Sequence, residues 1–318
     1  MELTPGLPDA AMPFVGDSGR SAPRARARSC ETIPTFYINR DRDVDRRQSV
    51  EAYLSAADLD AERVTAVEGE NVPESLRGYF FSGDRVHSTL KPGEIGCYAS
   101  HLSAMQLVVE RNHAYALILE DDAAVPHDIA EILADVLARV PRGWDIVHLC
   151  MDSNRAIKVV TPLNGGRRLV RYSRVPETTT GYLVSLAGAR KFLTPSKRYW
   201  PIDTDFRRPW AFGLDIYGVT PCFIVPIGVE SSIHLIGNHS RQRRGLPKPS
   251  LHCWTGNPLH TPLAAIFNVR KLGPAAWTIC AAHNATRRLV KMLGLHAFAQ
   301  RIGAVDFGRR IAESLAVR

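Results

Sequence analysis

Strand and helix patterns alternate along residues 34–230, and this alternation restricts the possible folds more than any other feature of the chain. Short apolar runs rich in aromatic and β-branched residues predict strands at 35–39, 63–69, 115–120 and 144–150. Segments with helical spacing lie between them, at 44–59, 92–112 and 128–140. The first of these helices is expected to turn four residues inward, Val44, Val50, Tyr53 and Leu54. Because parallel strands need crossover connections, usually helices, the pattern predicts an α/β fold with a mostly parallel, doubly wound sheet.

The second half of the chain changes character in two steps. After a turn at 164–168, the sequence predicts a strand at 169–175 and a strand leading into a helix at 178–193. A basic, linker-like segment occupies 241–250, and helical periods with one apolar and one basic face follow at 261–316. We therefore predict three parts: a disordered basic tail at 1–32, a sheet domain at 33–238, and a basic linker with a helical appendage at 239–318.

The positive charge of the chain is concentrated near its C-terminus. The formal net charge is +8, and beyond residue 240 thirteen lysines and arginines stand against two acids, Asp306 and Glu313. This asymmetry predicts an anionic partner, and the basic helical face suits an anionic membrane surface. A solvated face that packs against the sheet domain is the alternative. Nucleic acid is not expected, because no recognition motif or interleaved aromatic residues accompany the charge.

Composition predicts a location in the cytoplasm. The six cysteines are widely spaced and form no C-x-x-C pair, which favours free thiols in a reducing compartment and argues against a zinc site. No apolar stretch is long enough to span a bilayer, and the first 30 residues lack the basic start and apolar core of a secretory signal. We expect a cytoplasmic protein, bound at the periphery of the inner membrane through its basic helices.

Three consecutive acids, Glu120, Asp121 and Asp122, end the apolar run YALILE. Successive side chains of a strand point to opposite faces, so Glu120 and Asp122 are expected to share one side, with Asp121 pointing away. The carboxyl ends of parallel strands form the usual ligand crevice of an open α/β sheet. Mg²⁺ and Mn²⁺ are often held by one or two carboxylates together with substrate phosphates. The motif predicts such a metal site, and a solvated first helical turn with dipole-compensating acids is the alternative.

Five motifs occur in one order along the chain: FYINRDRDVDRR (36–47), GEIGCYASHLSAMQ (93–106), ALILEDDA (116–123), GYLVSLAGARKFL (181–193) and PIDTDF (201–206). Together they resemble glycosyltransferase family 25 over about residues 34–235. The resemblance implies an A-type, Rossmann-like glycosyltransferase domain. It also implies a UDP-sugar donor, most often UDP-galactose, with Mn²⁺ or Mg²⁺ as the cofactor. The implied reaction is transfer, with inversion, to a hydroxyl of a glycan or glycolipid such as a lipopolysaccharide core. The C-terminal region has no such match.

The segment after the first strand supplies candidates for donor binding. Asn39, Arg46 and Arg47 lie where an α/β sheet would place a nucleotide, and guanidinium groups pair well with phosphate. Surface salt bridges are the alternative for the two arginines.

A second set of candidates lies in the predicted helix at 92–112. Ser100 and His101 fall in the family's G-C-x-x-S-H segment, so the resemblance implies contacts to the donor. Hydrogen bonds to the helix backbone are the alternative for the histidine. Gly96 disfavours a helix, so it predicts that the backbone there approaches another element closely.

The resemblance also assigns roles to the acidic motif. Glu120 and Asp121 are implied at the donor site, and Glu120 and Asp122 at the metal. His234, which follows the last predicted strand, is a further candidate metal ligand that suits Mn²⁺ better than Mg²⁺. A structural or surface histidine is the alternative.

Candidates for the catalytic base lie later in the chain. Direct inverting displacement needs one base to take the proton of the acceptor hydroxyl. Asp203 lies on the family's P-x-D motif and is the first choice, either as the base or as an acceptor ligand. Asp205 is expected on the same strand face, and Asp215 is a third candidate. Each of the three could instead cap a loop.

Overall fold

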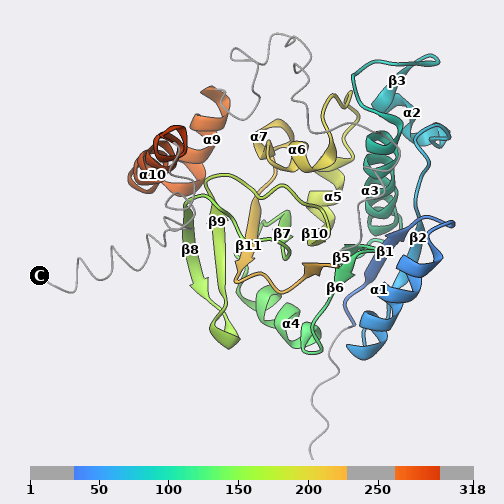
Figure 1. The fold of residues 1–318 in the computed structure, drawn as a ribbon, viewed down its shortest axis with the longest axis horizontal. Helices are drawn as coiled ribbons and strands as arrows, with labels where there is room; N and C mark the ends of the chain where they lie inside the picture. Colours follow the sequence, from blue (N-terminus) through green and yellow to red (C-terminus); the bar gives the residue numbers. More distant parts are fainter. Residues whose placement is uncertain (1–31, 228–261, 294–318) are drawn as a thin grey trace, which may run out of the picture. The chain divides into compact units, whose positions relative to one another are not determined.

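The computed structural model describes residues 32–227 and 262–293 and centres on an eight-stranded sheet (Figure 1). The strand order is β2-β1-β5-β10-β7-β11-β9-β8. The strands are β1 (Thr35–Asn39), β2 (Glu62–Thr65), β5 (Tyr115–Glu120), β7 (Ile146–His148), β8 (Ile157–Pro162), β9 (Arg168–Tyr172), β10 (Gly181–Ser185) and β11 (Ile216–Thr220). Only β9 and β10 run against the other six strands, so the predicted α/β fold with a mostly parallel sheet is confirmed.

Helices cover both faces of the sheet. The helices are α1 (Val44–Ala56), α2 (Glu74–Phe80), α3 (Pro92–Glu110), α4 (Ile129–Arg139), α5 (Leu186–Phe192), α6 (Ile202–Phe206), α7 (Pro209–Phe212), α9 (Pro262–Leu272) and α10 (Pro274–Met292). Helices α1 and α4 pack in one apolar core, while α2, α3, α5 and α6 pack in the other. Short pieces complete the described chain: β3 (Phe81–Ser82), β4 (Arg85–Val86), β6 (Ala123–Ala124), β12 (Val225–Pro226) and a 3₁₀ turn (Asn164–Gly166).

Strand β5 shows why the central strands are continuous apolar runs. Ala116 and Ile118 point into the core beneath α3, whereas Leu117 and Leu119 point into the core beneath α1 and α4. A strand that is buried on both faces has no solvent side, so it carries no alternating polar residues. This arrangement leaves the strand end as the first place where polar side chains can gather.

Two sequence expectations about local structure were wrong. In α1, Val50 and Leu54 are buried, but Val44 and Tyr53 are 43% and 40% exposed. The segment 201–206 forms helix α6, where we expected a strand face shared by Asp203 and Asp205. Pro201 precedes the helix and both acids fall in its first turn, where acids complement the helix dipole.

Helix α3 approaches the loop after β2 very closely at Gly96, which confirms the expectation from the sequence. A Cβ atom at Gly96 would lie 2.5 Å from the carbonyl oxygen of Val67. The loop is also fastened by Ser100, whose hydroxyl accepts from the backbone N–H of Val67 at 2.8 Å and donates to the carbonyl of Gly96 at 2.7 Å. This contact sets the distance between two walls of the cavity described below.

Replacing Gly96 with alanine is expected to lower the free energy of unfolding by about 1–3 kcal/mol, the usual cost of overpacking. The reason is that the clash falls on backbone, which cannot rotate away. Gly78 in α2 is a matched control, because a Cβ there meets nothing within 4 Å and alanine favours the helix. Urea denaturation of both variants measures the difference, and equal stabilities would contradict the close packing.

The C-terminal helices contact the β8–β9 end of the sheet. The Lys158 ammonium donates to the Leu272 carbonyl at 2.8 Å, and the Asn284 side chain donates to the Ser173 hydroxyl at 3.0 Å. Ala156, Leu272 and Cys280 form a small apolar cluster between these elements. None of the described helices combines the length and hydropathy needed to cross a bilayer.

Candidate active site

A cavity of about 270 Å³ lies at the carboxyl ends of the neighbouring parallel strands β1 and β5. Four segments supply its walls: residues 38–46, the loop 66–70 after β2, the first turns of α3, and the acids at the end of β5. The cavity therefore occupies the position in which open α/β sheets bind ligands. Seven of the candidates from the sequence line it: Asn39, Arg46, Ser100, His101, Glu120, Asp121 and Asp122.

Glu120 is held in one orientation by two donors. Thr179 donates its hydroxyl to Oε1, and the same oxygen lies 3.2 Å from Nε2 of His101. Nδ1 of His101 lies 3.0 Å from the hydroxyl of Tyr182, so both ring nitrogens have a partner. Burial alone would raise the pKa of Glu120, but the bonds from His101 and Thr179 and the charge of Arg46 hold it below its usual value. Glu120 is therefore a preorganised carboxylate.

Asp121 joins three elements at the base of the cavity. Its carboxylate accepts from the Asn39 amide at 2.8 Å and from Nε of Arg46 at 2.7 Å. Because β5 ends at Glu120, the alternation of a strand does not continue through the acidic motif, and all three acids line the cavity. Asp121 thus sets the position of Arg46, and Arg46 faces the cavity.

Asp122 lacks the partners that its neighbours have. Its Oδ1 is buried without a hydrogen-bond partner, and the nearest cation is Nη2 of Arg46, 3.6 Å from Oδ2. Burial, and then the charge of Glu120, raises the pKa of Asp122 to about 7. An unpaired buried carboxylate oxygen beside a second carboxylate fits a hard divalent cation, which would supply the missing positive charge. Nη1 of Arg46 is also buried without a partner and is available to an anionic ligand.

The three candidate bases lie in different surroundings. Asp205 is buried, and it accepts from the Tyr98 hydroxyl at 2.9 Å and from Arg208 at 2.8 Å. Asp215 forms an ion pair with Arg171 and does not line the cavity. Asp203 has a partly exposed carboxylate, and burial, followed by the charge of Glu177, raises its pKa to about 6.

Asp203 and the acidic motif both act on the thiol of Cys97. Burial raises the pKa of Cys97 well above its usual value, and the charges of Glu120, Asp203 and Asp122 add to the effect. A partly exposed carboxylate with a raised pKa suits a proton acceptor. Neither Asp203 nor Asp205 lines the cavity, and burial raises the pKa of both. Asp205 is buried and paired with Arg208, whereas Asp203 is partly exposed, so Asp203 is the better candidate.

Two further candidates from the sequence remain, Arg47 and His234. Arg47 does not line the cavity, and its Nε lies 3.8 Å from Glu51, one helical turn later. This is the surface pairing that the alternative interpretation predicted. His234 lies outside the described residues.

Sequence reasoning missed Cys97 and Thr179. The sulfur of Cys97, a ring nitrogen of His101 and a carboxylate oxygen of Glu120 lie within 4.8 Å of one another, so they could share a metal ion. Cys97 and His101 are four residues apart on α3, and that spacing was a usable signal for a shared face. Thr179 comes from the loop before β10, and no pattern in the chain connects it with Glu120.

Comparison with known proteins identifies the family. A family model described as "Glycosyltransferase family 25 (LPS biosynthesis protein)" matches residues 32–206, more than half of the chain. The chain therefore belongs to glycosyltransferase family 25. The matched region includes every element of the cavity and helix α6, but it ends before Asp215 and the helices α9 and α10.

Several curated proteins are similar to this chain. Procollagen galactosyltransferase 1-B of Xenopus laevis is 31% identical over 185 residues, which cover 53% of this chain and 29% of that protein. Inactive glycosyltransferase 25 family member 3 of Mus musculus is 29% identical over 209 residues, which cover 60% of this chain and 34% of that protein. The chain thus spans about a third of the length of these relatives or less.

Among solved structures, a glycosyltransferase involved in glycosylation of the major capsid of PBCV-1 matches 64% of this chain and 95% of its own, at 11% identity and a TM-score of 0.31.

Proposed function

We propose that this protein is a metal-dependent, inverting glycosyltransferase that moves a sugar from a UDP-sugar to a hydroxyl of a glycan acceptor. The observation that carries the proposal is the partnerless Oδ1 of Asp122 beside the preorganised Glu120, at the carboxyl end of β5 in a family 25 chain. Galactose is the proposed sugar, because several similar proteins are named galactosyltransferases. A lipopolysaccharide core or another surface polysaccharide is the proposed acceptor, in line with the description of the family.

Glu120 and Asp122 would hold the Mn²⁺ or Mg²⁺ ion. When bound, such an ion neutralises the charge that develops on a diphosphate leaving group. Arg46, oriented by Asp121, would add a donor to the same phosphates through its unpaired Nη1. Asn39 orients Asp121 and His101 orients Glu120, so both act by positioning these carboxylates.

Asp203 would accept the proton of the acceptor hydroxyl. As that oxygen forms its bond to the anomeric carbon, the bond from this carbon to the diphosphate oxygen breaks, and UDP leaves with the electron pair. The acceptor attacks from the side opposite the leaving group, so the configuration inverts and no covalent enzyme intermediate forms. The raised pKa of Asp203, about 6, lets it bind and release this proton near neutral pH.

Binding of UDP together with Mn²⁺ is expected to stabilise the folded protein. A ligand at one hundred times its Kd, bound only to the folded state, adds about 2.7 kcal/mol. Thermal unfolding should show a higher Tm with UDP and Mn²⁺ than with either alone, and a chelator should remove the increase. Asp122→Asn is the control, because it keeps the shape of the side chain without the charge. An equal increase in this variant would contradict the metal site.

One mouse relative is named as an inactive member of the family. The alternative function for this chain is therefore binding of a nucleotide sugar without transfer. Release of UDP from UDP-galactose in the presence of Mn²⁺ separates the two functions, because a binding protein shows the Tm increase without turnover.

The proposed location, the cytoplasmic face of a membrane reached through the basic C-terminal region, is tested by fractionating cells that express the full chain.

A further inference from the structure

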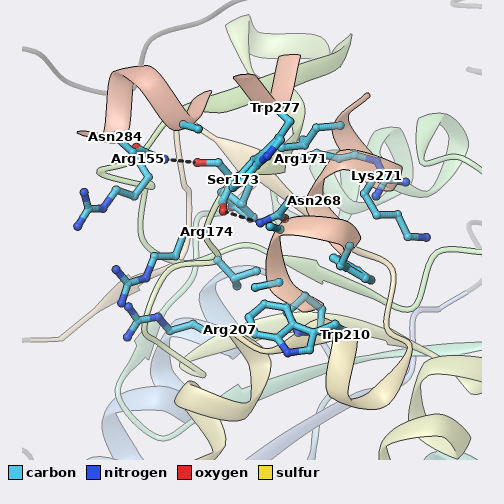
Figure 2. A pocket seen from close by; sticks show the side chains of 18 of the residues that line it. Arg155, Arg171, Ser173, Arg174, Arg207, Trp210, Asn268, Lys271, Trp277 and Asn284 are labelled. Atoms are coloured by element: carbon cyan, nitrogen blue, oxygen red, sulfur yellow. Dashed lines mark hydrogen bonds between the residues drawn. The ribbon is translucent and has the colours of Figure 1, made fainter. Parts of the chain in front are cut away.

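A second cavity, of about 340 Å³, lies among β9, the α6–α7 segment and the helices α9 and α10 (Figure 2). Its lining combines arginines with large apolar groups. The apolar part includes Val175, Trp210, Phe267, Leu272 and Trp277. Much of it comes from helices beyond residue 206, outside the region that the family model matches. This cavity plays no part in the proposed donor site.

Three arginines gather at one side of this cavity, Arg155, Arg174 and Arg207 (Figure 2). They also line an adjoining cavity of about 370 Å³ that includes Glu177, so they stand at the boundary between the two. Burial, and then the charges of Arg207 and Arg155, lowers the pKa of Arg174 to about 10. The three positive charges therefore repel one another at this boundary.

The described carboxylates do not balance this charge. Glu177 pairs with Arg207 at 2.6 Å and has a half-exposed side chain. Within residues 32–227 and 262–293, no carboxylate lies within ion-pair distance of Arg155 or Arg174. The Nε atoms of Arg174 and Arg207 are buried and have no hydrogen-bond partner. Buried donors without partners are costly, and an anion with several acceptor oxygens would satisfy them.

The arginine group lies close to the proposed base. Glu177 raises the pKa of Asp203, and Arg207, four residues after Asp203, lowers it. A molecule bound by these arginines would therefore lie near the group that takes the acceptor proton. The donor diphosphate has its own candidate site beside Arg46, in the other cavity.

We propose that Arg155, Arg174 and Arg207 bind the phosphate of an amphiphilic acceptor, whose apolar part occupies the cavity lined by Trp210, Phe267 and Trp277. The assignment as an acceptor rests on the proposed transferase function, whereas the binding of a phosphorylated amphiphile does not. Phosphate matches the several unpaired N–H donors, and the apolar wall distinguishes a lipid-like molecule from free phosphate.

Fluorescence titration of the full chain tests this site, because Trp210 and Trp277 line it. Dodecyl phosphate, kept below its micellar concentration, is the probe, and inorganic phosphate and dodecyl maltoside are the comparisons. We expect dodecyl phosphate to bind at least about tenfold more tightly than either comparison. Arg174→Gln should weaken its binding at least about tenfold, since a charged hydrogen bond is lost. Arg174→Lys should restore part of the affinity.

Arg142→Gln is the matched control, because it is the same substitution at an exposed arginine that lines neither cavity. Trp277→Phe assigns the signal to the cavity, and Arg155→Gln tests the site independently if Arg174→Gln does not fold. Equal binding of inorganic phosphate, or equal weakening by Arg142→Gln, would overturn the proposal.

Hydrolysis of UDP-galactose by the unmodified chain is measured in the same samples. Hydrolysis without arginine-dependent binding of dodecyl phosphate would refute the second site and leave the transferase proposal standing. Arginine-dependent binding without hydrolysis would support the amphiphile site and refute the transfer reaction.

Discussion

Replacing Asp122 with alanine is expected to lower sugar transfer at least about a hundredfold while the protein remains folded, since removing one group that stabilises developing charge has an effect of this order. Asp122 has no hydrogen bond to a neighbouring element through Oδ1, so the fold does not depend on it there. Turnover of UDP-galactose with saturating Mn²⁺, together with circular dichroism, measures both parts. Undiminished Mn²⁺-dependent turnover would refute the metal role of this carboxylate.

The isosteric variant Asp122→Asn separates charge from shape. Without divalent cations, the pKa of Asp122 is raised to about 7, from an ordinary value of 3.8. Between these values the folded state holds a proton that the unfolded state releases, so unfolding free energy falls as the pH rises through this window. The asparagine variant should therefore be about 1–3 kcal/mol more stable than the unmodified chain at pH 8, with little difference at pH 4. Equal stability at pH 8 would show that Asp122 already has a cationic partner.

Replacing Asp203 with asparagine is expected to lower turnover by about 10²–10⁴-fold, the usual contribution of a general base, with a much smaller change in donor affinity. The base must be ionised, so in the unmodified chain kcat/KM should rise with pH through about 6 and then level off. Saturating Mn²⁺ keeps Asp122 ionised, so this rise of kcat/KM with pH reports on Asp203. An unchanged rate in the variant would remove Asp203 as base or acceptor ligand.

Two neighbours of Asp203 provide controls for that experiment. Glu177→Gln should shift the rise of kcat/KM to lower pH, because the charge of Glu177 raises the pKa of Asp203. Asp205→Asn should lower the free energy of unfolding, because the hydrogen bonds to Tyr98 and Arg208 are lost. It should not change the pH at which kcat/KM rises. A rise of kcat/KM with pH that stays in place in Glu177→Gln, but is lost together with the activity in Asp205→Asn, would assign the base to Asp205.

The elements of the fold were largely predictable from local patterns. The strand at 35–39 was placed at its observed bounds, and the helix beginning at Val44 was found. The apolar run at 115–120 indicated a strand, which the structure buries on both faces, and its acidic end indicated a ligand site. Local signals were less reliable where a segment is short. The helix at 202–206 was expected as a strand, since five residues are too few to show a helical period.

By itself, the sequence determined the alternation of strands and helices in the first half of the sheet domain, the position of Glu120–Asp122 at a strand end, and the close approach at Gly96. Each of these depends on neighbours in the chain or on the absence of a side chain. Only the tertiary structure decided that Thr179 would hold Glu120, that Arg46 would pair with Asp121, and that Arg155, Arg174 and Arg207 would meet. These partners are 19 to 75 residues apart, as the positions of Arg155, Arg174, Arg46 and Asp121 illustrate. Their burial and charge are set by how the elements pack, and the pKa of a carboxylate responds to that packing more than to its sequence neighbours.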